Sequence, residues 1–374
     1  MSLKKWQEDL TRNITTTQEL ADKKLISEED KEKLQNIIDK YPMNITEYYL
    51  GLIKKNDYDD PIYKMCIPSL FEDNQEGVWD TSGEAANTVD NGIQHKYDNT
   101  VLLLSTNICS MYCRHCFRKR LVGVSEEETL TFVDKAVDYI KEHPEADNVL
   151  ITGGDAFLNS NKVIEKYLEK LIEIEHIKFI RFGTRVPVVF PQRITTDEDL
   201  LNILAKYKNK KTIYVVTQFN HYNEFTDEAK KSIELLRENG VPVLNQTVLL
   251  AGVNDNPQTL VKLFNRLVEA GISPYYLFQC RPLKGVKKYF AVPLSRAVDI
   301  VDQTRAKLSG VAKRFRFAMS HISGKIEIIG KTQDGRLIMK QHQARDNKDL
   351  NKFFTVSINE NTLWLDENYE YEIL

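Results

Sequence analysis

The sequence predicts a parallel α/β fold, with helices before it and a small strand-containing extension after it. From about residue 97, apolar runs of four to six residues alternate with longer amphipathic stretches about six times. A repeat of strand, helix and strand forms a parallel sheet whose active loops follow the carboxyl ends of the strands. A loop with three cysteines comes directly after the first apolar run, at that functional edge.

The first 96 residues differ from this repeat. Residues 1–56 are expected to be helical, because apolar residues recur at helical intervals among many charges. Ser27 is a candidate N-terminal helix cap, and Asp30 stands three residues later, at the second position of a capping box. Residues 57–96 contain several Pro and Gly residues without periodicity, which indicates an extended connection. We therefore expect a first region, residues 1–96, that packs as an appendage or lid.

The repeat itself defines the central region, residues 97–325. The expected strands are Val101–Leu104, Asn148–Thr152, Ile177–Phe182, Thr212–Val216, Val241–Leu244 and Pro274–Phe278. The expected helices between them are Val133–Lys141, Val163–Ile174, Leu200–Tyr207, Glu228–Asn239 and Thr259–Ala270. A C-terminal extension, residues 326–374, has short strands at Lys325–Gly330 and Gly335–Met339.

Composition narrows the class of protein. The formal net charge of −3 gives no reason to expect a nucleic-acid partner. The chain has no run of 18 apolar residues and begins without an apolar signal region, so we expect a cytoplasmic protein with no membrane partner. Five cysteines fit a reducing compartment better than a disulfide framework.

The most informative motif is the spacing C-x3-C-x2-C formed by Cys109, Cys113 and Cys116. Three thiolates can hold three irons of a [4Fe–4S] cubane and leave the fourth iron open for chemistry. One alternative is a structural zinc site completed by His115, which lies between two of the cysteines. The other is chance burial of unrelated thiols, because free Cys behaves as a small hydrophobe.

This cysteine motif is the signature of radical S-adenosylmethionine (SAM) enzymes, in which SAM chelates the open iron. Over roughly residues 6 to 340 the chain also resembles the lysine 2,3-aminomutase family. The motifs that carry this resemblance are Cys109–Cys116, Thr152–Ala156, Thr184–Thr195, Gln218–Glu224 and Val241–Asp255. The resemblance implies a radical SAM partial (β/α)6 barrel and an enzyme that uses SAM with pyridoxal 5′-phosphate (PLP) to move an amino group between adjacent carbons.

Three loops after strands are expected to bind SAM. Gly153 and Gly154 allow the backbone to approach a ligand closely. The resemblance implies that Asp155 accepts hydrogen bonds from the ammonium group of SAM. The alternative for Asp155 is a helix cap in a tight turn. His221 follows the strand at 212–216, and Gln246 lies near the strand at 241–244, where it is expected to reach the nucleoside or methionine part of SAM.

The resemblance also implies residues for PLP. In the family, a lysine after a glycine-rich segment carries this cofactor, and here that position is Lys325, with Lys331 as a second candidate. Tyr97 corresponds to a family tyrosine near PLP. The arginine expected three residues later is Thr100, so phosphate contacts must come from elsewhere. Arg185 and Arg193 are two candidates for those contacts.

The substrate contacts differ from those of the lysine-specific members. Arg118 fills the family position that binds the substrate α-carboxylate. The two family aspartates that pair with the lysine side chain are replaced by Arg281, after Cys280, and by Ala318. A lysine ammonium ~4 Å from Arg281 would cost about 4 kcal/mol at an effective dielectric of about 20. We therefore expect an acidic substrate, glutamate or aspartate; the alternative is that Arg281 turns toward a structural acid and a small neutral amino acid such as alanine binds.

Further expectations follow from the resemblance. No cysteine follows Cys280, so the family's C-terminal zinc ligands are missing and we expect no zinc. A flavodoxin- or ferredoxin-type electron donor and a homo-oligomer are expected partners. Two other functions stay open: another radical SAM reaction, on a peptide or protein residue, and a non-catalytic metal-binding regulator.

Overall fold

The computed structural model describes residues 3–54 and 57–373. These residues form two compact units, each assembled from separate stretches of the chain. The first unit comprises Met1–Leu70, Thr88–Gln218 and Asn223–Leu244, and the second comprises Phe71–Asn87, Phe219–Tyr222 and Asn245–Leu374. The expected boundaries at residues 96 and 325 follow sequence order rather than these compact units, and they stay a prediction.

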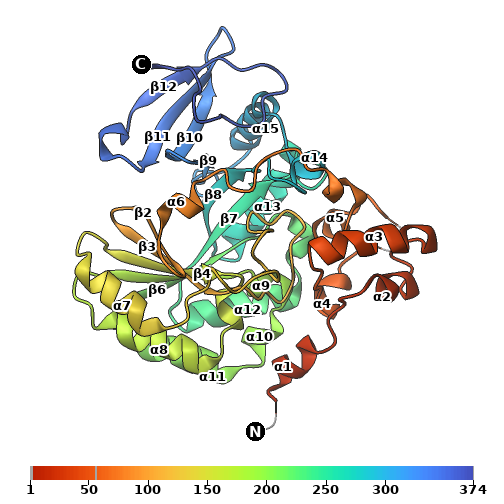
Figure 1. Ribbon diagram of the computed structural model, residues 1–374, viewed down its shortest axis with the longest axis vertical. Helices are drawn as coiled ribbons and strands as arrows, with labels where there is room; N and C mark the ends of the chain where they lie inside the picture. Colours follow the sequence, from red (N-terminus) through yellow and green to blue (C-terminus); the bar gives the residue numbers. More distant parts are fainter. Residues whose placement is uncertain (1–2, 55–56, 374) are drawn as a thin grey trace. The chain divides into compact units, whose positions relative to one another are not determined.

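The first unit is built on a parallel sheet whose strand order follows the chain. Its parallel strands are β3 (Thr100–Thr106), β4 (Asn148–Gly153), β5 (Phe179–Gly183) and β6 (Thr212–Thr217). Its covering helices are α7 (Val133–Glu142), α8 (Asn161–Ile172), α11 (Glu198–Tyr207) and α12 (Asp227–Glu238). Helices α7, α8 and α11 lie side by side along this sheet (Figure 1), and each buries one apolar face. The loops at the carboxyl ends of these strands carry most of the motifs.

Two short strands extend this sheet in the antiparallel direction. Strands β1 (Thr88–Asp90) and β2 (Ile93–Tyr97) form a hairpin, and β2 pairs with β3. The turn between them needs Gly92, which has a φ of +74°. The sequence predicted an extended connection here and did not identify these two strands.

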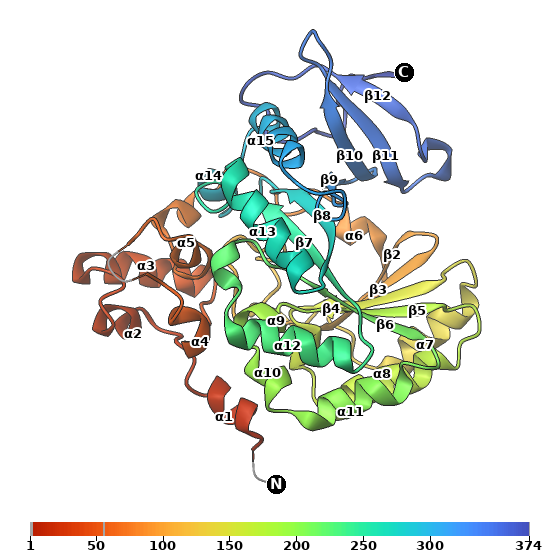
Figure 2. The ribbon, with the colours of Figure 1, turned by 180° about the vertical axis from the view of Figure 1, so that it is seen from behind.

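Among the described residues of the first unit, five helices come before the hairpin; the first four lie in the predicted helical region, and the fifth lies in the predicted extended connection. They are α1 (Lys5–Leu10), α2 (Thr17–Asp22), α3 (Glu28–Lys40), α4 (Glu47–Leu50) and α5 (Pro61–Cys66). The predicted cap of α3 is confirmed, since the Ser27 hydroxyl accepts a hydrogen bond from the Asp30 amide at 3.1 Å. Figure 2 shows α2 to α5 grouped together.

The second unit combines helices with a mostly antiparallel sheet. Strand β8 (Ser273–Gln279) runs parallel to β9 (Arg316–His321). Antiparallel strands β10 (Gly324–Lys331), β11 (Leu337–Ala344), β12 (Phe353–Val356) and β13 (Glu372–Ile373) then follow in chain order. Its longer helices are α13 (Pro257–Glu269) and α15 (Leu294–Ala306), and its short ones are α6 (Glu84–Asn87) and α14 (Lys287–Phe290).

The predicted architecture is confirmed. Strand β7 (Val243–Leu249) completes the six strands β3 to β8 that the sequence predicted, and all five expected helices are present. The sheets mix parallel and antiparallel pairs and stay open, because strands β1 and β13 each pair with one neighbour. The fold is therefore a partial (β/α)6 barrel with the predicted helical and C-terminal additions. Among the described residues, we find no helix that could span a membrane.

Candidate active site

The three cysteines lie in the long loop between β3 and α7 of the first unit. Cys113 and Cys116 form a tight turn, in which the Cys116 amide donates to the Cys113 carbonyl at 3.0 Å. The all-sulfur donor set of three cysteines fits a cluster of several irons.

His115 does not complete a zinc site with these cysteines. Its Nε2 lies 3.2 Å from the side-chain nitrogen of Gln218, an amide donor, and so acts as an acceptor. Burial lowers the pKa of His115 well below 6.5, and the charges of Arg185 and Lys119 lower it further. His115 is thus a neutral, buried side chain whose polar contact is with Gln218. The zinc alternative for the cysteine motif would need a cysteine-facing nitrogen of His115 besides the Nε2 that contacts Gln218.

Gly153 and Gly154 hold the start of the cysteine loop against the end of β4. The Gly154 amide donates to the Thr106 carbonyl at 2.5 Å, and the Asp155 amide donates to the Ile108 carbonyl at 2.8 Å. A Cβ at Gly154 would lie 2.7 Å from the backbone N and C of Ile108. Gly153 has a φ of +119°, which disfavours other residues. The glycines therefore permit a close approach of the backbone to the cysteine loop, and their approach to SAM stays a prediction.

The N-terminal region also positions this loop, which the sequence did not reveal. The side-chain amide of Asn44 donates to the Cys109 carbonyl and that of Asn13 to the Ser110 carbonyl, each at 2.9 Å. The buried guanidinium of Arg114 donates to the carbonyls of Tyr41 and Pro42, at 3.0 to 3.2 Å. The expected helical appendage thus holds the cysteine loop in place.

Arg185 contacts one of the three cysteines, a contact that the sequence did not predict. One guanidinium nitrogen lies 2.8 Å from the Cys113 sulfur, and another lies 2.5 Å from the Glu224 carboxylate and 3.2 Å from the Tyr49 hydroxyl. Burial opposes its charge, but Cys113, Tyr49 and Glu224 together raise the pKa of Arg185. The sequence had offered Arg185 for the PLP phosphate, and that role stays a prediction.

Arg118 lies close to the other two cysteines. It is buried, and one guanidinium nitrogen is 3.4 Å from the Gly153 carbonyl. Burial raises the pKa of Cys109, and it raises that of Cys116 to about 11, whereas the charge of Arg118 opposes both shifts. The free thiols therefore hold their protons, and metal binding must displace them.

Asp155 acts as a helix cap, which was the alternative interpretation of its motif. Its carboxylate accepts hydrogen bonds from the Phe157 amide, the Thr184 hydroxyl and the Arg185 amide at 2.5 to 3.0 Å. A carboxylate has about four acceptor positions, so these contacts use most of them inside the protein. Burial raises the pKa of Asp155, although these hydrogen bonds oppose the shift. A contact to SAM stays a prediction.

The chain segments that carry His221 and Gln246 are hydrogen-bonded to each other in the second unit. The neighbours of Gln246 on β7, Asn245 and Thr247, hydrogen-bond the Phe219 backbone and so hold the segment that carries His221. Side chains alternate along β7, so half-buried Gln246 points to the other face of the strand. Their contacts to SAM also stay predictions.

The buried imidazole of His221 makes stability depend on pH. Burial, with the charges of Lys262 and Arg266, lowers the pKa of His221 from 6.5 to about 4. Below about pH 6.5, His221 therefore binds a proton in the unfolded chain but stays neutral in the folded chain. The free energy of unfolding falls as the pH drops toward 4. We expect His221 to account for about 2 kcal/mol of the loss between pH 7 and 5. Urea unfolding at both pH values checks this, and His221→Gln should show a correspondingly smaller loss; an equal loss in both proteins would contradict it.

The two candidate PLP lysines have different surroundings in the second unit. Half-buried Lys325 lies near the start of β10, with its Nζ 4.8 Å from the centre of the Tyr276 ring and 5.9 Å from that of Phe278. Lys331, at the end of the same strand, pairs with the exposed Asp299 at 2.6 Å. An aromatic surface suits the stacking of a flat cofactor, whereas an ion pair at the surface does not. The surroundings favour Lys325.

Arg281 and Ala318 come from neighbouring strands of the same unit. Phe278 of β8 pairs with Ala318 of β9, and Arg281 follows three residues after Phe278. Ala318 is fully buried. The Arg281 guanidinium donates to the Ser82 hydroxyl at 2.8 Å, and its charge contributes to lowering the pKa of Asp80. The residues that replace the two family aspartates thus occupy one end of the β8–β9 pair.

The remaining candidates for PLP contacts, Tyr97 and Arg193, are in the first unit. Tyr97 ends β2, and Lys96 lies 5.7 Å from the centre of its ring. Arg193 is fully buried, pairs with Asp197 at 2.5 Å and lies over the ring of Trp6 at 4.3 Å. These contacts indicate a structural role for Arg193. Contacts of Tyr97 or Arg193 with PLP stay predictions.

Comparisons with known proteins agree with the geometry. The model of the radical SAM superfamily matches residues 103–264. L-lysine 2,3-aminomutase of Clostridium subterminale is 40% identical over 308 residues, which are 82% of this chain and 73% of that one. The enzyme of the same name from Acetoanaerobium sticklandii is 39% identical over 82% of this chain and 73% of its own. Glutamate 2,3-aminomutase of Clostridioides difficile is 36% identical over 82% of this chain and 72% of its own.

These findings confirm the resemblance found in the sequence. A radical SAM fold with three loop cysteines implies SAM and a [4Fe–4S] cluster as cofactors. The relatives are aminomutases, which places this chain among the isomerases. Because the relatives named for lysine and for glutamate have similar identities, identity does not decide the substrate. The chain belongs to the lysine 2,3-aminomutase family of radical SAM enzymes.

Proposed function

We propose that this enzyme is a PLP-dependent 2,3-aminomutase that moves the α-amino group of an acidic amino acid, glutamate or aspartate, to its β-carbon. The observation that carries the proposal is the pair Arg281 and Ala318, which stands where the lysine-specific members have two aspartates. A relative named for glutamate shows that the family includes such an activity.

The charge of Arg281 decides between lysine and an acidic substrate. A substrate ammonium at ~4 Å from the guanidinium would be disfavoured by about 4 kcal/mol, which is about a thousandfold in binding. A substrate carboxylate would instead gain a charge-assisted hydrogen bond. The turn that contains Ser82 already orients the guanidinium, so little side-chain entropy is left to lose on binding.

Each remaining residue then has a definite task. Arg118 would hold the substrate α-carboxylate, and Lys325 would hold PLP. Tyr97 would border this cofactor, and His221 and Gln246 would bind SAM. When bound, the cluster and SAM supply the radical chemistry that breaks an unactivated C–H bond, and PLP supplies the conjugated ring for the nitrogen shift. The protein keeps the reacting carbons aligned and excludes other hydrogen donors. An external donor of the flavodoxin or ferredoxin type would supply the electron for this chemistry.

Alanine is the second candidate substrate, and a specific contact favours it. Asp80 lies close enough to Arg281 for the two charges to interact, so part of the positive charge is already compensated. If that compensation is complete, the side-chain pocket is neutral and a small apolar side chain fits. The other functions, a radical SAM reaction on a peptide residue and a metal-binding regulator, would form no β-amino acid.

The assignment of Lys325 can be tested directly with Lys325→Ala and Lys331→Ala. We expect Lys325→Ala to lose the visible absorbance of covalently bound PLP and at least about 99% of turnover, because the cofactor loses its attachment. Lys331→Ala should keep both, since its ammonium pairs with Asp299. The reverse pattern, with absorbance lost only in Lys331→Ala, would move the PLP site to Lys331.

A further inference from the structure

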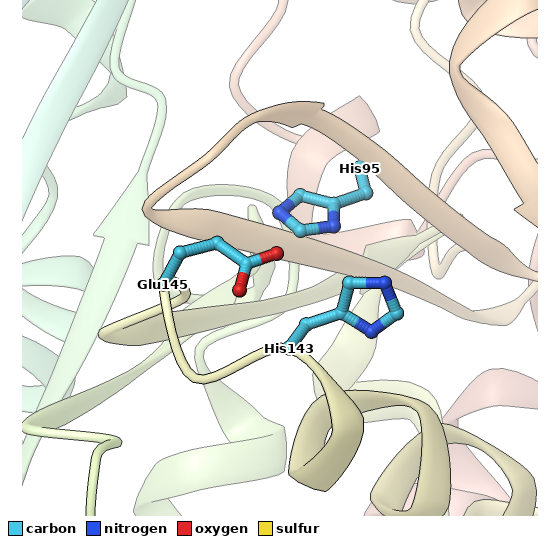
Figure 3. Close-up of side chains that lie close together, drawn as sticks. All are labelled: His95, His143 and Glu145. Carbon is cyan, nitrogen blue, oxygen red and sulfur yellow. The ribbon is translucent and has the colours of Figure 1, made fainter.

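A cluster of metal-ligating side chains lies in the first unit, outside the cysteine loop. It comprises His95 on β2, His143 at the end of α7 and Glu145 in the loop before β4. One imidazole nitrogen of each histidine and one carboxylate oxygen of Glu145 all lie within 4.8 Å of one another. Figure 3 shows the three side chains turned toward one another from these separate elements.

The hydrogen bonds of His143 prepare it to bind a cation. Its Nδ1 lies 2.7 Å from the Tyr139 carbonyl, which can only accept, so Nδ1 carries the proton. The lone pair is therefore on Nε2, at the outer end of the ring. A histidine whose second nitrogen donates to a backbone carbonyl has the usual arrangement of a metal ligand, because that bond fixes both tautomer and ring orientation.

His95 is fixed in the same way, with the opposite tautomer. Its Nε2 lies 3.0 Å from the Asp98 carbonyl and donates to it, which leaves the lone pair on Nδ1. The Tyr139 hydroxyl lies 2.8 Å from this Nδ1 and donates to it. A cation would bind Nδ1 in place of this hydrogen bond. The Tyr139 hydroxyl oxygen would then be close enough to act as a further ligand of the cation.

The electrostatics of the cluster suit a divalent ion. Two neutral imidazoles and one carboxylate give a donor set with a single negative charge. The carbonyl end of α7 adds partial negative charge where His143 lies. Both histidines are half-buried and Glu145 is exposed, so a cation can enter from solution.

We propose that His95, His143 and Glu145 form a binding site for a divalent transition-metal ion, with Zn²⁺ as the best match. Two imidazoles and a carboxylate are a donor set found in zinc sites, whereas Mg²⁺ and Ca²⁺ prefer oxygen ligands throughout. The expectation of no zinc rested on missing C-terminal cysteines and does not bear on these residues. A bound ion would join β2 to the α7–β4 loop and so stabilise the strand that ends at Tyr97.

Zinc binding by the full-length protein tests the proposal. The [4Fe–4S] cluster is reconstituted first, so that its iron occupies the three cysteines, and Zn²⁺ is then titrated against a chromophoric chelator. We expect one Zn²⁺ per chain, and binding at least about tenfold weaker in His143→Gln and in His95→Gln. Glutamine at position 143 can still donate to the Tyr139 carbonyl, so the helix end keeps its contact. His176→Gln is the matched control, because His176 is also half-buried in this unit and its Nε2 contacts the Ile140 carbonyl.

Thermal unfolding provides a second readout that does not depend on turnover. Added Zn²⁺ should raise the Tm of the wild type and of His176→Gln but not that of His143→Gln, because an ion that binds only the folded state stabilises it. Equal zinc affinity in the wild type and both cluster variants would overturn the proposal. Weaker binding in His176→Gln to the same degree would also overturn it, since the effect would then not be specific to the cluster.

Discussion

Gly154→Ala is expected to prevent assembly of the iron–sulfur cluster, with iron and sulfide content after anaerobic reconstitution falling at least about tenfold. The added Cβ would lie 2.7 Å from the backbone N and C of Ile108, one residue before Cys109. Backbone atoms cannot rotate away as a side chain can, so the loop must shift and the first cysteine must move with it. Iron analysis and the electron paramagnetic resonance signal of the reduced cluster measure the loss.

Gly310→Ala provides the matched control for this substitution. A Cβ at Gly310 meets no atom within 4 Å, and the residue has no positive φ. This variant should reconstitute as the wild type does, so the comparison separates the effect of the clash from the general effect of replacing glycine. A Gly154→Ala protein with a full cluster and normal turnover would show that the close approach to the cysteine loop is not needed.

The double substitution Arg281→Asp with Ala318→Asp is expected to change the preferred substrate from an acidic amino acid to lysine. It removes a positive charge and restores the two carboxylates of the lysine-specific members. Removing a repulsion of about 4 kcal/mol corresponds to about a thousandfold in kcat/KM for lysine. The values of kcat/KM for lysine, glutamate and aspartate, from mass spectrometry of the β-amino acid products, measure the change.

Two single variants sharpen this experiment. Arg281→Lys keeps the positive charge and should keep the preference for an acidic substrate, with weaker binding because the planar fork is lost. Ala318→Asp alone buries a carboxylate beside Arg281, so an internal ion pair should weaken acidic substrates without creating a lysine enzyme. If the double variant keeps the wild-type preference, Arg281 does not face the substrate.

The fold was largely predictable because its signals are local. Helix α13 illustrates this, since Asn256 caps it, Pro257 begins it and its apolar residues share one face. Strand β9 was missed because its apolar run, Phe317–Met319, is only three residues long. Strands β1 and β2 were missed because they are short and lie in a glycine-rich segment. Pairing with a neighbouring strand, which the sequence does not display, makes these segments β-structure.

The site was predictable where residue type and spacing carry the chemistry, as at Cys109, Cys113 and Cys116. The residues that support the cysteine loop left no such signal. Asn13 and Asn44 reach it from a region that is distant in sequence, through hydrogen bonds to backbone carbonyls. Arg185 lies in a recognised motif, but only the structure reveals its contact with the Cys113 sulfur. Such contacts depend on tertiary structure, so spacing along the chain cannot predict them.

Product analysis with separate amino acids tests the central claim most directly. The reconstituted protein, with SAM, PLP and a reductant, is offered glutamate, aspartate, alanine, lysine and arginine in turn, and the products are identified by mass spectrometry. The charge at Arg281 predicts a β-amino acid from glutamate or aspartate and little or none from lysine. β-Lysine as the main product would contradict the proposed substrate, and cleavage of SAM with no β-amino acid from any of the five would contradict the proposed activity.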